Sequence, residues 1–530
     1  MAIVQARLLV NLVIRRALSA VLIGTTLLLI LSAFRVGVDR GDDTRIALSA
    51  RGYLVDAICG VLSVEKYGTG RYVCANAAWT DMYSVGLGKD QATLDRLGMT
   101  IAQWATNTTL INQGIKAVFG GPSRPSNGID RALGWGMDSG YMDFVQFSFW
   151  VFGEKLESLY KGFYLLLAIS ATLFAIQFAN RPVALLTLVG FAYAFFFLVD
   201  YAMVPLELNS NTSRLVSLLA IIPLLHTTFL AIEDEPPAAK TILLLIPQGF
   251  VMGAASDFRG LAYWTVIALV GTFSFFIAHR RWYLQFGWRD ASSPCWPILV
   301  VIGCLAITVT FTMRQADPNI EKIGGMRSHT FWEPLYYDLQ KHPDWNVKYG
   351  FIHQYKTADE VPWQAVQNYR DRHHLAGPMI IGQDYENYLR IVYLNFIRKH
   401  TWFLIQLKYY DFLLWVRFCT TYIKAMFQSF NISEIGFGAV ILFAFLTINY
   451  NEPKLLRKII VYLSCLCLFF ILASGVIWAF ILDPDLLGDM LILGMMVNLA
   501  LVFWGLSAVG ILAVRRALAV FAKPSNSGRL

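Results

Sequence analysis

Long uninterrupted apolar runs are the feature that most limits how this chain of 530 residues can fold. About ten of them reach or approach the roughly 20 residues that an α-helix needs to cross a bilayer. They lie at residues 17–34, 160–178, 183–201, 215–232, 241–255, 261–278, 298–312, 435–448, 459–482 and 490–514. Charged residues make up only 15% of the chain, against about 25% in soluble domains, which excludes a soluble enzyme. The sequence therefore predicts an all-α polytopic membrane protein with about ten transmembrane helices.

The Lys and Arg residues near the ends of these runs predict the orientation of the chain, because cytoplasmic loops carry an excess of them. With the N-terminus inside, the cytoplasmic side receives Arg15, Arg16, Arg181, Lys240, Arg280, Arg281, Arg289, Lys454, Arg457, Lys458, Arg515, Arg516 and Lys523. The short loops 200–212 and 483–489 on the opposite side contain no Lys or Arg. Ten spans with both termini in the cytoplasm satisfy this pattern. We expect a bacterial inner (plasma) membrane protein whose net charge of +8 reflects its topology and not a nucleic-acid partner.

Two segments on the outer side, 35–159 and 314–433, are too long to be simple connectors. The chain accordingly divides into six parts: 1–34 with the first helix, 35–159, 160–313 with helices 2–7, 314–433, 434–514 with helices 8–10, and a cytoplasmic tail 515–530. Both outer segments mix aromatic and charged residues, which favours folded structure over disorder. Cys59 and Cys74 lie in the first outer segment and either form a disulfide or remain free thiols.

Each outer segment also contains a stretch typical of an interfacial helix. Residues 141–152 are aromatic-rich but too short to span a bilayer. Residues 400–430 are long enough, yet Lys408, Asp411, Arg417 and Lys424 would be costly at the midplane. We expect both to lie on the outer leaflet, with a small domain of helices and loops around the second.

Three aspartates follow the first span within a few residues. Asp39, Asp42 and Asp43 belong to the stretch Val-Asp-Arg-Gly-Asp-Asp-Thr at 38–44, just above the predicted outer surface. Carboxylates in this position can cap the next helix and complement its dipole. They can equally serve as a general base at the membrane interface. Both interpretations stay open from spacing alone.

The order of these features resembles the GT-C superfamily of membrane glycosyltransferases. Residues 42–50, Asp-Asp-Thr-Arg-Ile-Ala-Leu-Ser-Ala, look like the "DE…ALxA" stretch of that superfamily. Phe149-Trp150-Val151-Phe152-Gly153 is similar to the "FxxFG" element before its second span. The resemblance covers roughly residues 17–181. The Lys-Pro-Pro or His-Pro-Pro stretch of many relatives is replaced here by Met-Asp-Ser-Gly at 137–140, and the oligosaccharyltransferase WWD motif is absent, which indicates an outlying branch.

The resemblance implies a transfer reaction on the outer face of the membrane. A sugar carried on a polyprenyl phosphate or diphosphate passes to a glycan, lipid or protein acceptor. A carboxylate takes the proton of the acceptor hydroxyl, and the order of preference for that base is Asp42, Asp43 and then Asp39. No cofactor and no metal site is assigned, although a divalent cation beside these acids is left open.

The departing phosphate needs a cation at headgroup depth. Arg259, in a very short outer loop, and Arg214, at the start of the fourth span, are the candidates, and the alternative for each is an arginine that snorkels to the headgroups. In the second outer segment, His329 is a candidate for phosphate binding and Trp332 for a sugar platform. Asp138, in a glycine-rich bend, either contacts the ligand or caps a helix.

Two histidine features receive structural interpretations. His226 lies inside the fourth span, where a satisfied interhelical hydrogen bond is a better explanation than a proton relay. His373 and His374 are adjacent and do not share a helix face, which disfavours a zinc site. Two other functions remain as alternatives: a flippase or exporter of lipid-linked saccharide, and a non-catalytic protein of cell-envelope polysaccharide assembly. A polar lining within the spans would favour transport.

Overall fold

The structure is a computed structural model of the chain, and it describes part of it. The described residues are 2–41, 139–153, 157–201, 218–233, 236–258, 263–283, 295–315, 332–339, 360–375 and 383–410, with isolated positions around 285–292 and between 413 and 469. Within these ranges the chain is almost entirely helical and contains no strand. The predicted all-α class is confirmed to that extent.

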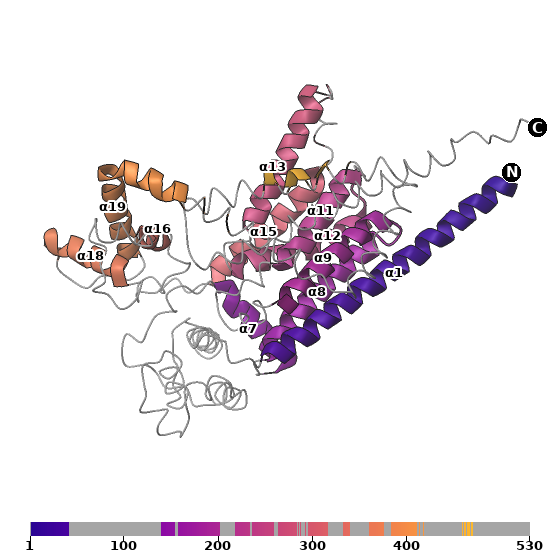
Figure 1. Ribbon diagram of the computed structural model, residues 1–530, viewed down its shortest axis with the longest axis horizontal. Coiled ribbons are helices and arrows are strands. Elements are labelled where there is room, and N and C mark those ends of the chain that lie inside the picture. The colour runs from indigo at the N-terminus through magenta and orange to yellow at the C-terminus, as the bar shows by residue number, and fades with distance from the viewer. Residues whose placement is uncertain are drawn as a thin grey trace, which may run out of the picture.

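The first helix, α1 (Ala2–Gly41), is longer than the apolar run inside it. Its 40 residues give a length of about 60 Å, roughly twice the thickness of a hydrocarbon core. The first predicted span ends at Phe34, but the helix continues through the stretch that contains Asp39 and ends at Gly41. In Figure 1, α1 lies along one side of the other apolar helices.

The next six predicted spans are all helices in the structure. Their bounds are α8 (Glu157–Gln177), α9 (Pro182–Tyr201), η2 and α11 (Leu218–Ala220, Ile221–Glu233), α12 (Ala239–Phe258), α13 (Tyr263–Ala278) with η4 (His279–Tyr283), and α15 (Trp296–Gln315). The short helix predicted at 141–152 is also present as α7 (Ser139–Phe152). The spans at 435–448 and 490–514 lie outside the described residues, as does most of 459–482.

Three of the described helices are long and apolar enough to cross a membrane. The qualifying segments are Arg16–Arg35, Ser158–Gln177 and Ala239–Ser256, and shorter apolar segments occur at Pro182–Tyr193, Leu218–Glu233 and Trp296–Thr308. Large apolar side chains such as Leu28 on α1, Leu243 on α12 and Leu299 on α15 point outward. An outward apolar surface of this kind suits a membrane protein, whose solvent is lipid.

The centre of the helix bundle is α11, in which every residue from Ile221 to Ile232 is buried. It contacts α8, α12, α13 and α15. The α12–α15 pair is packed closely, with Cys304 and Thr308 of α15 facing two glycines of α12. Pro247 lies inside α12 and cannot donate a backbone hydrogen bond to the preceding turn.

The second outer segment contains a separate group of helices (Figure 1). They are α16 (Trp332–Asp338), α18 (Glu360–Arg372), α19 (Gln383–Lys399) and a further helix over residues 401–410. We call this group the outer helices. Their shared apolar core includes Leu335, Leu339, Val366, Tyr385, Leu389, Phe403 and Leu407. The Tyr385 hydroxyl donates to Glu333 Oε1 at 3.1 Å, which links α19 to α16. The predicted helix over 400–430 is seen as far as Tyr410, with isolated helical residues at Leu413 and Arg417.

Candidate functional site

Hydrogen bonds between helices fix which helix ends lie together. Gln177 Nε2 donates to Thr241 Oγ1 at 3.4 Å, and Gln248 Nε2 donates to the Ser170 carbonyl at 2.7 Å. These two pairs set α8 and α12 antiparallel, so the start of α8 lies level with the end of α12. The Tyr164 hydroxyl donates to the Ala33 carbonyl at 3.0 Å, which brings the end of α1 to the same height.

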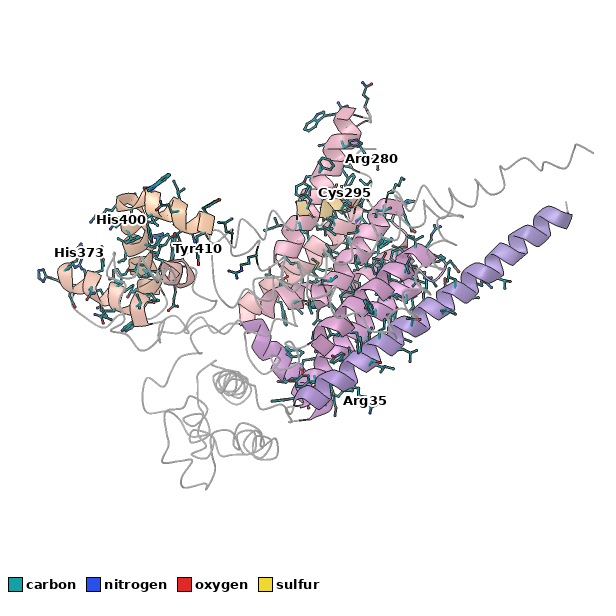
Figure 2. All side chains as sticks on the ribbon, viewed as in Figure 1. Arg35, Arg280, Cys295, His373, His400 and Tyr410 are labelled. Atoms are coloured by element: carbon teal, nitrogen blue, oxygen red, sulfur yellow. The ribbon has the colours of Figure 1, made fainter. Side chains whose placement is uncertain are left out.

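We call this end of the bundle the Gly41 end; it consists of residues 33–41 of α1, 157–164 of α8 and 255–258 of α12. Arg35 of α1 lies here, whereas Arg280 lies at the opposite end (Figure 2). The opposite end holds an ion pair in which Arg181 Nε is 3.0 Å from Glu233 Oε1. The two ends of the bundle therefore have distinct sets of charged residues.

Helix α7 packs across the Gly41 end, against both α8 and α12. Phe144, Ser148 and Phe149 form its buried face. The contact with α8 depends on Gly162, because a Cβ at that position would collide with the side chain of Ser148. After α7 the chain turns directly into α8, and the Ser158 hydroxyl holds this turn by donating to the Gly153 carbonyl at 2.5 Å.

Aromatic side chains hold the end of α1 against its neighbours. The ring of Tyr164 meets Phe34 edge to face, with centroids 5.1 Å apart. Phe163 stacks on Phe195 of α9 at 6.0 Å, and Tyr164 also contacts Phe195. Edge-to-face and offset contacts of this kind are the favoured geometries of aromatic pairs. These contacts hold the end of α1 against α8 and α9. The predicted catalytic acids come directly after this part of α1 in the sequence.

The predicted site residues at this end are reached from three helices. Asp39 belongs to the last turns of α1, although its side chain is not among the described ones. Asp42 and Asp43, which come next, lie outside the described residues, as do Asp138 and Arg259. Asp138 directly precedes α7, and Arg259 directly follows Phe258, the last residue of α12. The chain therefore enters all four undescribed positions from helices that meet at the Gly41 end.

Of the remaining predicted site residues, the structure describes only Trp332. Arg214 and His329 lie outside the described residues, as do Cys59 and Cys74. Trp332 begins α16, where its backbone N–H donates to Glu386 Oε2 at 3.1 Å. Its half-buried ring packs on the core of the outer helices, 5.8 Å from the ring of Tyr393. The described contacts of Trp332 are therefore with the other outer helices.

A buried polar cluster in the middle of the bundle is only partly anticipated by the sequence. Gln248 Nε2 donates to the Ser170 carbonyl and lies 3.2 Å from His226 Nδ1, while the Ser170 hydroxyl donates to Gln248 Oε1. With the amide as donor, His226 Nδ1 accepts and Nε2 carries the ring proton. Among the described residues Nε2 has no hydrogen-bond partner, and the imidazole ring contacts the rings of Phe174 and Phe178. The predicted interhelical hydrogen bond of His226 is confirmed for one ring nitrogen and not for the other.

The signal for this cluster was available in the sequence, because Gln248 follows Pro247 in an otherwise apolar helix. Polar residues in such helices pair with one another or with backbone groups. Among the described residues, no three His, Cys, Asp or Glu side chains gather at metal-binding distances. His373 stacks on Tyr369, with ring centroids 4.1 Å apart.

The described helices that lead to Asp42, Asp138 and Arg259 meet at the Gly41 end, and these residues themselves lie outside the described part of the chain. A carboxylate there can accept a proton from a hydroxyl group. An arginine at the same height can neutralise a phosphate. In comparisons with protein-family models, curated proteins and solved structures, no match to the chain was found.

Proposed function

We propose that the protein is a membrane glycosyltransferase that moves a sugar from a polyprenyl phosphate or diphosphate to an acceptor on the outer face of the membrane. The observation that carries this proposal is the course of α1. The helix continues through Asp39 to Gly41, and it meets α7 and α12, the helices that border Asp138 and Arg259 in sequence, at the Gly41 end. In the proposed site, carboxylates and an arginine follow or precede helix ends that meet at one end of the bundle, and this end is proposed to face the outer headgroups.

In the proposed reaction, Asp42 or Asp43 takes the proton of the acceptor hydroxyl while the acceptor oxygen bonds to the anomeric carbon of the sugar. The bond from that carbon to the lipid phosphate oxygen breaks, and the phosphate leaves with the electron pair. A free hydroxyl is a weak nucleophile at neutral pH, so removal of its proton is the step that a carboxylate accelerates. Arg259 or Arg214 stabilises the negative charge that grows on the phosphate.

The topology that we propose with this function has ten spans and both termini in the cytoplasm. Support comes from the positions of the charged residues. Arg181, Glu233 and the exposed Lys240 lie at the end of the bundle opposite Gly41. α12 runs toward the Gly41 end, and α13 begins five residues after the end of α12 and leads back to Arg280 and Arg281. An excess of basic residues at that end is typical of the cytoplasmic side.

The test is transfer by the purified full-length protein from a mixture of polyprenyl-phosphate sugars, compared with Asp42→Asn and Asp43→Asn. The amide keeps the shape of the side chain and loses the proton acceptor. We expect one of the two variants to release lipid phosphate about 10²-fold or more slowly than the parent. Asp371→Asn, at an exposed position of α18, is the control and keeps parental activity. Parental rates in both variants would transfer the role to Asp39 or Asp138, and no turnover with any donor would contradict the transferase.

A second function, translocation of a lipid-linked saccharide, is favoured by one observation. Ser170, Gln248 and His226 place polar groups in the middle of the bundle, where a transported headgroup would pass. These groups bond mainly to one another, however, and phenylalanines enclose them. In a vesicle assay, loss of flipping in Gln248→Leu with normal flipping in Asp42→Asn would favour the transporter, whereas no flipping by the parent together with loss of sugar transfer in Asp42→Asn favours the transferase.

A further inference from the structure

The helix over residues 401–410 has two different faces. Phe403 and Leu407 are buried in the core of the outer helices. On the other side, Trp402, Ile405 and Tyr409 are 69%, 52% and 65% exposed, and Leu413 continues the row. The spacing i, i+3, i+7 and i+11 puts these four side chains on one helix face. We call these residues the Trp402 face. A row of large exposed apolar side chains marks an interaction surface more often than a free one.

The composition of this face suits the headgroup region of a bilayer. Trp and Tyr concentrate at membrane–water interfaces, because one part of each ring is apolar and the other is polar. Arg398 and Lys399 are exposed in the last turn of α19, directly before this helix. From Asn387 to Leu413, the end of the Trp402 face, the sequence contains four Lys or Arg residues and one acidic residue, Asp411. An amphipathic helix with basic residues beside an aromatic face is typical of segments that bind anionic lipids.

The course of the chain brings the helix over residues 401–410 back toward the bundle. α19 ends at Lys399, and the chain bends at His400. The following helix then runs toward the bundle, so that Tyr410 lies on the bundle side of the outer helices (Figure 2). The next predicted span begins at residue 435, after a segment that must approach the membrane. The helix thus connects a folded outer core to a part of the chain that is expected to enter the bilayer.

We propose that the Trp402 face rests on the outer leaflet and that Arg398 and Lys399 bind the phosphates of anionic lipid headgroups. The bilayer then covers the side of the outer helices that the protein leaves exposed. One helix serves both surfaces, with its Phe403 side packed on protein and its Trp402 side on lipid. This inference depends on the proposed topology, which places residues 314–433 outside, and not on the transfer reaction.

The test is photo-crosslinking of the full-length protein in lipid nanodiscs, with a benzophenone amino acid in place of Ile405. We expect an adduct whose added mass is that of a phospholipid. The control replaces Asn368, an exposed residue of α18 that does not belong to the Trp402 face, and gives no lipid adduct. Absence of the lipid adduct at position 405, or an adduct with a second copy of the chain or another protein, would overturn the proposal.

The anionic component has its own test in nanodiscs that contain equal amounts of phosphatidylglycerol and phosphatidylcholine. The parent should crosslink preferentially to phosphatidylglycerol. Arg398→Gln combined with Lys399→Gln should lower that preference on the order of tenfold, because each basic residue near the surface contributes to the attraction. An unchanged preference contradicts headgroup binding by these two residues. Lipid adducts form whether or not the protein transfers sugar, so failure here is distinguishable from failure of the transferase.

Discussion

The two ring nitrogens of His226 have different surroundings, and a double-mutant cycle can measure the difference. Nδ1 accepts from Gln248, whereas Nε2 has no hydrogen-bond partner among the described residues. Gln248→Leu leaves both nitrogens without a partner, so we expect it to lower the free energy of unfolding by about 1–3 kcal/mol. His226→Phe removes the unpartnered N–H together with the acceptor, and its cost should be smaller.

In the double variant His226→Phe with Gln248→Leu, no buried ring nitrogen is left, so the loss should be no larger than that of Gln248→Leu alone. The measurement is the unfolding midpoint in detergent, with Thr172→Val at an exposed position of α8 as control. Additive losses from the two single changes would show that Gln248 and His226 do not depend on each other.

The residue type alone predicted the surroundings of His226 better than those of Trp332. The polar character of His226 in an apolar span was sufficient to predict a bond to another helix. Its partner was not predictable, because the sequence does not say that Ser170 and Gln248 lie level. For Trp332, the sequence favoured a sugar platform, whereas the described contacts are those of a residue that packs on the core of the outer helices. The acids from Asp42 to Asp138 remain predictions.

The contact between α12 and α15 depends on small side chains, and a single larger one should separate these helices. A Cβ on Gly253 would lie 2.6 Å from Thr308 Oγ1 and 2.9 Å from Thr308 Cβ. Gly249, one turn earlier, faces Cys304 in the same way. Pairs of small residues four apart are typical of close helix contacts in membranes. We expect Gly253→Leu to lower the free energy of unfolding by about 1–3 kcal/mol or more, since overpacking forces the helices apart.

The matched control lies on the partner helix. A Cβ on Gly303 of α15 meets nothing within 4 Å, so Gly303→Ala should leave stability unchanged or raise it slightly through helix propensity. Thermal unfolding in detergent measures both variants. Equal losses at Gly253 and Gly303 would show that any glycine substitution is harmful in these helices and that the α12–α15 contact has no special role.

Helices as elements were predictable to within a few residues, because apolar length is a direct property of the sequence. The extension of α1 beyond Phe34 was not, since residues 36–41 have no apolar run and continue the helix without it. The packing of the helices against one another was also not predictable. Hydropathy is high for both α11 and α1, although α11 is buried on all sides and α1 exposes Leu28. Which helices touch depends on side-chain shape around the whole helix, and an apolar pattern does not specify it.

The described residues form two sets of helices that differ in what they bury and what they expose. The bundle exposes large apolar side chains on its surface. The outer helices bury a core of Leu, Val, Phe and Tyr side chains, as a soluble domain does. The two sets should therefore respond to different perturbations. Burial raises the pKa of Tyr336 in that outer core to about 12 from its usual 10.0, and Arg372 lowers it in part.

The raised pKa of Tyr336 predicts that the outer helices lose stability at alkaline pH. Above about pH 10 the unfolded chain releases the phenolic proton, whereas the folded chain retains it up to about pH 12. The unfolded state then binds fewer protons, so the free energy of unfolding falls as the pH rises through this interval. Tyr336→Phe removes the ionisable group and should shift the alkaline unfolding midpoint upward, while Tyr409→Phe, at an exposed position, should not. Circular dichroism combined with tyrosinate absorbance follows both events, and identical midpoints in the parent and Tyr336→Phe would show that another group controls alkaline unfolding of the outer helices.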